Sequence, residues 1–150
     1  MPNPGIPFDE IVIEQIVKSN TGIDDRILKL HQAKKSSADQ KKDILRLISV
    51  LDLTSLNGND TPERISNLLQ KAQFPLAGNT VQVAAVCVYQ PFIAQAVSAL
   101  KHTELGVACV AGGFPAGQMD LAVKCADIEK SVQLGATEID MVINRTNPLT

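Results

Sequence analysis

The sequence predicts an α/β protein with a parallel sheet, and three observations support this. Short apolar runs alternate with amphipathic helical segments, which is typical of repeated β-α-β units. Residues 82–88 and 106–110 read as apolar runs without polar alternation, as in strands buried on both faces. Proline or glycine marks helix boundaries at Pro62, Pro91 and Gly135. Right-handed crossovers between consecutive strands would then give a parallel sheet.

Residues 1–47 predict an N-terminal helical extension. The apolar face of its first helix is formed by Phe8, Ile11, Val12 and Ile16. This helix is expected to stop at Gly22, and a second short helix is expected over residues 24–33. Ser37 and Gln40 form an S-x-x-Q capping box that would begin a third helix.

Residues 48–150 predict four strands alternating with three helices. The strands are expected at 50–53, 82–88, 106–110 and 138–143. The first helix of this region has Thr61 as its N-cap and an apolar stripe of Ile65, Leu68, Leu69 and Ala72. The second helix is expected to start at Pro91. The third is expected over 120–134, with an apolar side of Leu121, Cys125, Ile128 and Val132. This spacing fits a (β/α) barrel, of which a complete example needs eight strands and roughly 250 residues, or a small doubly wound sheet.

Composition argues against several classes of protein. The 14 basic and 16 acidic residues leave a net charge of −2, and aromatic residues are too few for a nucleic-acid surface. No apolar run approaches the ~20 residues of a membrane span, and the N-terminus does not resemble a signal peptide. The three cysteines are widely spaced with no C-x-x-C, so no metal site is expected. Reduced thiols without an export signal predict a cytoplasmic protein.

Candidate functional side chains follow the predicted strands, because function in parallel α/β proteins gathers at the carboxyl ends of strands. Asp52 and Thr54 stand at the end of the first strand, Cys87 at the second, and Asp140 within the fourth. Asp140 lies in the apolar run 139–143, where a charge is costly unless it is paired or used. The alternative is that Asp52 and Asp140 are structural carboxylates bonded to loop amides or paired with Arg145.

Three further features bear on function. Gly112, Gly113 and Gly117 fit neither the dinucleotide-binding nor the P-loop spacing, so a tight loop is expected rather than a phosphate cradle. Asp60 is expected to cap the helix that begins at Pro62. No lysine falls in an apolar strand, where desolvation could lower its pKa for imine chemistry. These residues alone therefore contain no complete catalytic set.

Four segments resemble the deoxyribose-phosphate aldolase family. They are 52–61, 84–89, 113–117 and 135–145, in this order and each at a strand end, and the resemblance covers residues 48–150. It implies the first four units of a TIM (β/α)8 barrel and a class I aldolase, which is a lyase without metal or other cofactor. Such enzymes reversibly cleave the phosphorylated sugar 2-deoxy-D-ribose 5-phosphate to acetaldehyde and D-glyceraldehyde 3-phosphate.

The same resemblance implies roles for individual residues. Asp140 matches the aspartate of the proton relay, and Asp52, Thr54 and Cys87 match the lining of the substrate pocket. In the family a lysine on the sixth strand forms the Schiff base. We therefore expect the chain to be the N-terminal half of such an enzyme, natural or truncated by design, and to be inactive alone. Its exposed half-barrel surface predicts a homodimer.

The chain departs from the family's pattern after the second predicted strand. The family usually has Tyr-Pro after the second strand, whereas this chain has Tyr89-Gln90-Pro91, which predicts a shift of that loop. The alternative function is a self-sufficient flavodoxin-like module that binds an anionic small ligand at the glycine-rich loop 112–117.

Overall fold

The computed structural model describes residues 9–19, 22–33, 36–78 and 80–144. The chain divides into two compact units, Met1–Asp39 and Gln40–Thr150. The first unit contains two helices, α1 (Glu10–Ser19) and α2 (Ile23–Gln32), neither of which has a buried side chain. Phe8, expected in the first helix, lies outside the described residues. Gly22, expected to stop that helix, is the N-cap of α2 and has a φ of 91°.

Helix α3 (Ser37–Ile48) shows that the predicted capping box was wrong by one residue. The hydroxyl of Ser36, not that of Ser37, accepts a hydrogen bond from the Asp39 amide at 3.1 Å, and it donates to the Asp39 carboxylate at 2.6 Å. Ser37 already lies inside the helix. Ser36, one residue before the predicted position, is therefore the N-cap of α3.

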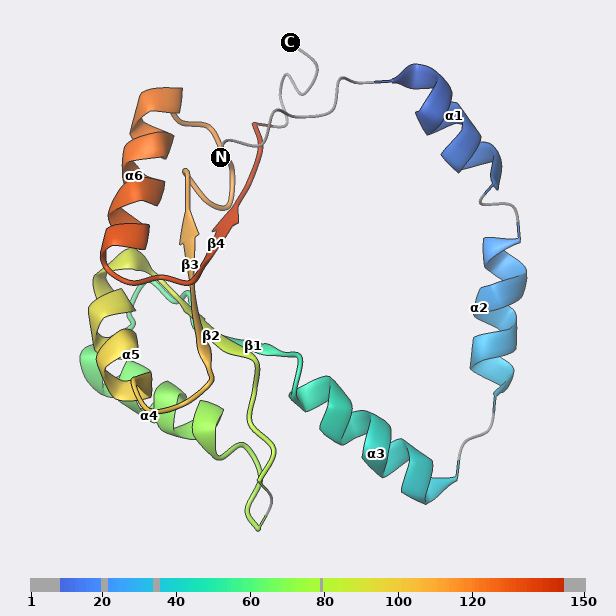
Figure 1. Cartoon of the computed structure of the whole chain (residues 1–150), viewed down its shortest axis with the longest axis horizontal. Coiled ribbons are helices and arrows are strands. Elements are labelled where there is room, and N and C mark those ends of the chain that lie inside the picture. Colours follow the sequence, from blue (N-terminus) through green and yellow to red (C-terminus); the bar gives the residue numbers. More distant parts are fainter. Residues whose placement is uncertain (1–8, 20–21, 34–35, 79, 145–150) are drawn as a thin grey trace. The chain divides into compact units, whose positions relative to one another are not determined.

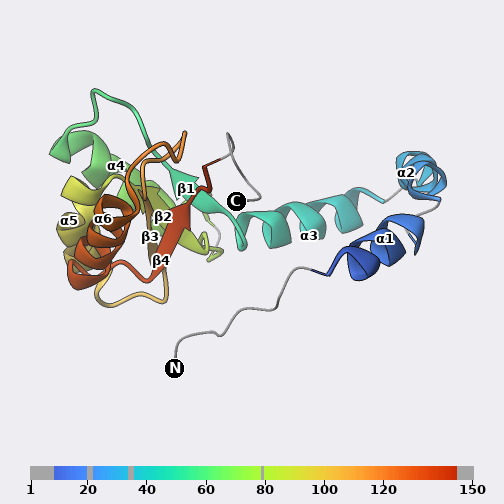
Figure 2. The same ribbon diagram turned by 90° about the horizontal axis from the view of Figure 1, so that it is seen from above.

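The second unit contains a parallel sheet in the order β1-β2-β3-β4 (Figure 1). Its strands are β1 (Asp52–Thr54), β2 (Ala85–Val88), β3 (Gly106–Ala111) and β4 (Glu138–Met141); its helices are α4 (Pro62–Gln73), the 3₁₀ turn η1 (Gln90–Phe92), α5 (Ile93–Leu100) and α6 (Leu121–Gln133). Helices α4, α5 and α6 all lie on one face of the sheet, as the view from above in Figure 2 shows most clearly. The prediction of an α/β fold with parallel strands is confirmed. The flavodoxin-like order 2-1-3-4-5, with helices on both faces, differs from this arrangement.

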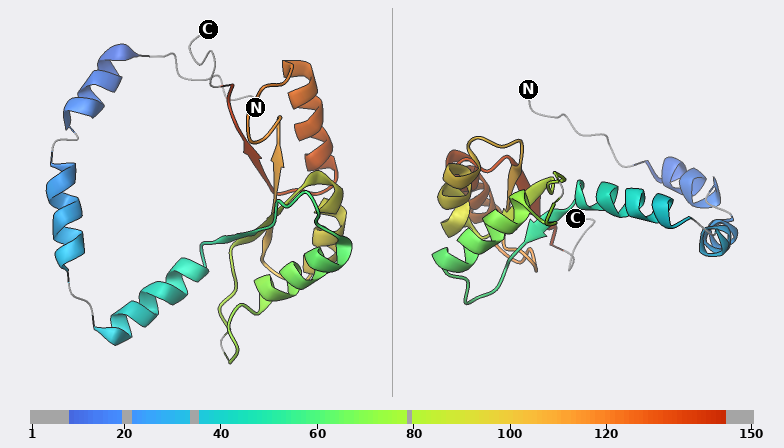
Figure 3. Two further views of the ribbon diagram at one scale, coloured as in Figure 1. Left: turned by 180° about the vertical axis from the view of Figure 1, so that it is seen from behind. Right: turned by 90° about the horizontal axis from the view of Figure 1, so that it is seen from below.

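The two faces of the sheet carry different side chains, because successive residues of a strand point to opposite sides. On the helix side, strand residues such as Val86, Val88, Val107 and Cys109 pack with Ile65, Leu69, Ile93, Ala96 and Leu100 in the larger core cluster. On the opposite side, Cys87, Ala108 and Val110 form a second, smaller cluster with Leu56, Tyr89 and Phe114. Both views in Figure 3 show the three helices on the same side of the strands.

Helix α4 forms as the sequence predicts. Thr61 caps it, accepting a hydrogen bond from the Arg64 amide at 3.3 Å, and Pro62 is its first residue. The apolar stripe is buried at Ile65, Leu69 and Ala72, with Leu68 partly buried. Asp60 does not cap the helix, which corrects the prediction. Its carboxylate instead accepts hydrogen bonds from residues of the preceding loop.

Helix α6 presents a different side to the sheet than its apolar pattern predicts. Leu121 is 74% exposed and Val132 54% exposed, Cys125 is also exposed, and Ile128 is partly buried. The buried residue of this helix is Ser131. Within the part of the chain that the structure describes, no helix is long and apolar enough to cross a membrane.

Candidate active site

The four predicted site residues share the sheet face opposite the helices. In the register, Thr54 lies beside Cys87, Cys87 beside Ala108, and Asp140 beside Val110. Asp52 lies two residues before Thr54 and therefore points to the same side. The sheet brings Cys87 and Asp140 into contact: the Cys87 thiol donates a hydrogen bond to Oδ2 of Asp140 at 3.4 Å. Thr54 instead donates to the backbone oxygen of Asp52 at 3.0 Å.

Cys87 is held in its protonated form. Its side chain is 2% exposed, and burial raises the pKa of the thiol from 9.0 to about 12. Burial is the largest cause of this shift, and the hydrogen bond to Asp140 and the electrostatic interactions with Asp140, Cys109 and Asp52 contribute to it. A thiolate is the reactive form of cysteine, so this residue is poorly suited to be a nucleophile. It is suited to donate a hydrogen bond to the Asp140 carboxylate.

The loop after β1 is organised around Asp60. Its carboxylate accepts hydrogen bonds from the Ser55 hydroxyl at 2.8 and 2.9 Å and from the Asn57 amide at 3.1 Å. Desolvation opposes ionisation of Asp60, but the hydrogen bonds from Ser55 and Asn57 prevail and lower its pKa. Asp60 is thus an anionic group that fixes this loop.

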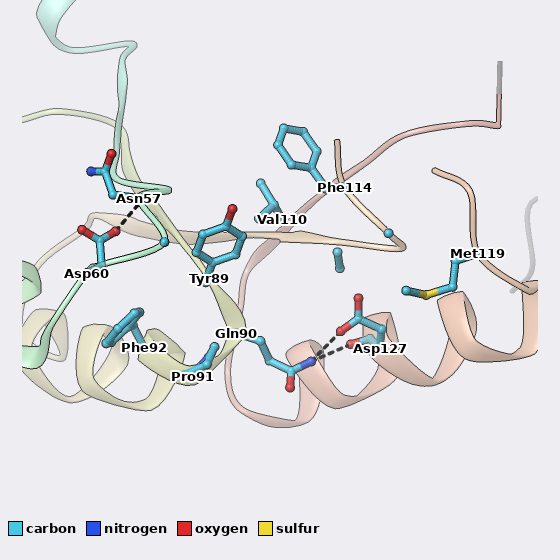
Figure 4. A pocket seen from close by; sticks show the side chains of 13 residues that line it. Asn57, Asp60, Tyr89, Gln90, Pro91, Phe92, Val110, Phe114, Met119 and Asp127 are labelled. Atoms are coloured by element: carbon cyan, nitrogen blue, oxygen red, sulfur yellow. Dashed lines mark hydrogen bonds between the residues drawn. The ribbon is translucent and has the colours of Figure 1, made fainter. Parts of the chain in front are cut away.

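A cleft of about 580 Å³ opens at the carboxyl ends of β1, β2 and β3. Figure 4 shows Tyr89 in the middle of it, with Phe114 and Val110 on one side and Gln90 and Asp127 on the other. The remaining lining residues are Asn57, Gly58, Asp60, Pro91, Phe92, Ala111, Gly113 and Met119. Asp52, Thr54, Cys87 and Asp140 do not line this cleft. It borders them through Val110, which lies beside Asp140 in the sheet and packs against Cys87.

The glycine-rich loop 112–117 is a tight turn, which confirms the structural interpretation of its glycines. Gly112, Gly113 and Gly117 all have positive φ, and the Gly117 amide donates to the Gly113 carbonyl at 2.8 Å. A Cβ at position 117 would lie 2.6 Å from the backbone oxygen of Ile143. Glycine at 117 therefore lets the loop approach the chain that follows β4.

The described contacts of the carboxylates include neither a metal site nor an ion pair with Arg145. Among the described residues, no group of three or more metal-ligating side chains is placed to hold a metal ion. Arg145, the predicted ion-pair partner, lies outside the described residues. Within the described part of the chain, the hydrogen bond that Asp140 accepts comes from Cys87 on β2, across the intervening strand β3.

Comparison with known proteins gives the same result as the four motif segments. No protein-family model matches the chain. Deoxyribose-phosphate aldolases of Mus musculus and Homo sapiens are each 41% identical to it over 119 residues, which is 71% of this chain and 37% of each relative. A Caenorhabditis elegans protein assigned to the same enzyme is 38% identical over 148 residues, covering 95% of this chain and 48% of the relative. The chain is a homologue of the deoxyribose-phosphate aldolases.

Solved structures agree with this relationship. A structure from Coccidioides immitis assigned to deoxyribose-phosphate aldolase has a TM-score of 0.60 and 29% identity, covering 69% of this chain and 38% of that chain. The tetrameric deoxyribose-phosphate aldolase of Aeropyrum pernix shares the fold at a TM-score of 0.56 and 22% identity, with 75% of this chain and 48% of that chain covered. The chain spans less than half the length of the curated aldolases that it matches.

Some residues of the cleft were not singled out from the sequence. Asn57 and Phe114 lie within the recognised segments 52–61 and 113–117, so the resemblance contained a signal for them. Met119 and Asp127 carried no signal, because an apolar residue just before a helix and a polar residue within one are both common without any role in a site. Their place in the cleft depends on how the loops fold.

Proposed function

We propose that this chain supplies one side of a deoxyribose-phosphate aldolase site, built on four strands of a (β/α)8 barrel. Consecutive strands lie side by side in chain order, and every helix between them lies on the same face, as in such a barrel. The opposite face would then be the barrel interior, and it carries Asp52, Thr54, Cys87 and Asp140. The observation that carries the proposal is the Cys87–Asp140 contact on this face.

In the proposed reaction, Asp140 moves protons while an imine-forming lysine cleaves 2-deoxy-D-ribose 5-phosphate into acetaldehyde and D-glyceraldehyde 3-phosphate. A carboxylate in an active site can accept and return a proton at successive steps. The protonated Cys87 thiol donates a hydrogen bond to one oxygen of Asp140, and among the described residues none donates to the other oxygen. In this role Cys87 orients the carboxylate, while Asp52 and Thr54 contribute polar groups to the pocket wall.

We further propose that the 150-residue chain forms no catalytic imine by itself. None of the strands β1–β4 contains a lysine, so this interior face offers no amine beside Asp140. The test is incubation with acetaldehyde and borohydride, followed by mass spectrometry of the intact chain. We expect no stoichiometric adduct, whereas the aldolase of Mus musculus treated in parallel should be trapped. A stoichiometric imine on this chain would overturn the proposal.

We also propose that the half-barrel associates as a twofold-symmetric homodimer. In the described sheet, β1 pairs only with β2 and β4 only with β3, so each presents a free edge. Met141 and Ile143, at and just after the end of β4, are 54% and 62% exposed. Multi-angle light scattering at micromolar concentration should give twice the monomer mass. A folded monomer under these conditions would contradict this part of the proposal.

We propose that all of the site residues belong to one of the two domains that the sequence predicts. Residues 1–47 form a helical extension, and residues 48–150 form the half-barrel that carries the site. The described helices α1 and α2 contain none of the proposed site residues. Deleting the extension should therefore leave the Cys87–Asp140 contact intact, as read from the reactivity of the Cys87 thiol.

A further inference from the structure

A hydrogen-bonded group of four residues lies on the helix side of the cleft. Gln90 follows β2, Gly112 follows β3, and Asp127 and Ser131 belong to α6; together they are called the Asp127 clamp. Asp127 Oδ1 accepts a hydrogen bond from the Gln90 side-chain amide at 2.7 Å, and its Oδ2 accepts one from the Gly112 backbone amide at 2.8 Å. One carboxylate therefore joins the chain segments that leave two neighbouring strands.

Ser131 fixes the clamp to the core. Its side chain is fully buried, and its hydroxyl donates to the Asp127 carbonyl at 2.9 Å. The same hydroxyl accepts a 3.3 Å hydrogen bond from Gln90 and a 3.7 Å contact from the Cys109 thiol. Gly112 is also buried. Since buried polar groups are costly unless paired, these mutual hydrogen bonds explain why α6 turns a polar side toward the sheet.

The segments that the clamp joins carry the aromatic walls of the cleft. Tyr89 directly precedes Gln90, and Phe114 follows Gly112 by two residues. Both aromatic side chains pack on the same small cluster with Cys87 and line the cleft (Figure 4). A change in the separation of Gln90 and Gly112 would move these walls relative to each other.

We propose that Asp127 is a positioning residue that sets the separation of Tyr89 and Phe114 across the cleft. A carboxylate suits this role because each of its two oxygens accepts from a different donor. An asparagine cannot replace it, since its amide nitrogen would face one of the two N–H donors. Any effect of Asp127 on aldol cleavage rests on the proposed function, because the cleft borders the sheet face that carries Asp140. The positioning of Tyr89 and Phe114 does not rest on it.

The test uses the full chain and a property of its composition. Tyr89 is the only tyrosine and tryptophan is absent, so tyrosine fluorescence reports Tyr89 alone. In Asp127→Asn, we expect stronger acrylamide quenching of Tyr89. We also expect hydrogen exchange at the Gly112 amide to be about tenfold faster or more, since a hydrogen bond to a charged group is lost. In Gln90→Leu, quenching of Tyr89 should rise while the Gly112 amide remains protected from hydrogen exchange, because Oδ2 of Asp127 still accepts its hydrogen bond.

The matched control is Asp120→Ala, which removes the N-cap of the same helix without touching the clamp. The Asp120 side chain accepts a hydrogen bond from the Ala122 amide at 2.9 Å, so its loss weakens α6 at the N-terminal end of the helix. We expect this variant to change neither Tyr89 quenching nor Gly112 exchange. Equal changes in Asp120→Ala and Asp127→Asn, or no change in Asp127→Asn, would overturn the proposal. If Asp127→Asn does not fold, unchanged quenching in Gln90→Leu overturns it. No substrate is used, so failure of the aldolase proposal leaves this result interpretable.

Discussion

The interaction of Asp140 with Cys87 makes a quantitative prediction about thiol reactivity. At pH 9, a thiol with the ordinary pKa of 9.0 is half ionised, whereas Cys87, with a pKa of about 12, is ionised in about one molecule in a thousand. Asp140→Asn removes one cause of this shift, the charge of Asp140, and weakens a second, because the thiol then donates to a neutral amide oxygen instead of a carboxylate. The pKa of Cys87 should then fall, and each unit of fall increases the thiolate fraction about tenfold.

The assay is alkylation by iodoacetamide at pH 9, with the labelled cysteines distinguished by peptide mass spectrometry. We expect Cys87 to react on the order of ten times faster in Asp140→Asn than in the parent chain. Burial is the largest cause of the raised pKa and remains, so Cys87 should still react more slowly than the exposed Cys125. The control is Glu138→Gln, which removes a carboxylate from the same face two residues earlier. An unchanged Cys87 rate in Asp140→Asn, or an equal increase in Glu138→Gln, would refute the reasoning.

Three further predictions concern stability. Gly117→Ala places a Cβ 2.6 Å from a backbone oxygen at a φ of +69°. It should lower the free energy of unfolding by about 1–3 kcal/mol in urea denaturation, whereas Gly58→Ala, with open space around it, should change little. Because folding raises the pKa of Cys87, the folded state holds a proton that the unfolded state releases. The stabilisation is complete below pH 9 and is lost toward pH 12, by about 1.4 kcal/mol per pH unit. Cys87→Ala should lack this alkaline slope, and an identical slope would contradict the burial of the thiol. Ile65→Ala, at a fully buried position, should cost about 2–5 kcal/mol, but Leu121→Ala, at a 74% exposed position, should cost about 0.5 kcal/mol or less. Equal losses at these two positions would contradict the observed orientation of α6.

The sheet could be predicted because its central strands have an unambiguous composition. The segments that became β2 and β3 are buried on both faces, so the sequence shows apolar runs where the structure has strands. The first strand was predicted two residues too early, because the apolar residues at its expected start belong to the end of α3. The amides of Val50 and Leu51 donate to Leu47 and Ile48 at 3.2 Å, so these residues extend the helix end. The strand therefore begins only at Asp52.

The errors at Asp60 and in α6 have a common physical origin. In both cases a carboxylate has partners that the local pattern does not specify. Ser55 and Asn57 hold Asp60 in the loop before the helix, so Thr61 provides the cap. In α6, Asp127 binds groups 37 and 15 residues away in the chain, and this turns its polar side toward the sheet.

The sequence could place the four candidate residues on one face of the sheet, because strand periodicity and register agree there. Asp52, Thr54, Cys87 and Asp140 stand at positions that a parallel sheet directs to one side. Their roles in proton transfer and substrate binding come from the resemblance and remain predictions. The cleft could not be predicted, because Tyr89, Phe114 and Asp127 come together only when the segments after β2 and β3 and helix α6 pack at the strand ends.

We propose that the face bearing Asp140 is the proton-transfer side of an aldolase site. The decisive measurement is the kcat of a chimera in which this chain replaces the matching segment of the Mus musculus deoxyribose-phosphate aldolase. We predict that the chimera cleaves 2-deoxy-D-ribose 5-phosphate, and that Asp140→Asn lowers its kcat by about 10²–10⁴-fold. A folded chimera that is inactive, or one whose kcat is the same with and without Asp140→Asn, would contradict the claim.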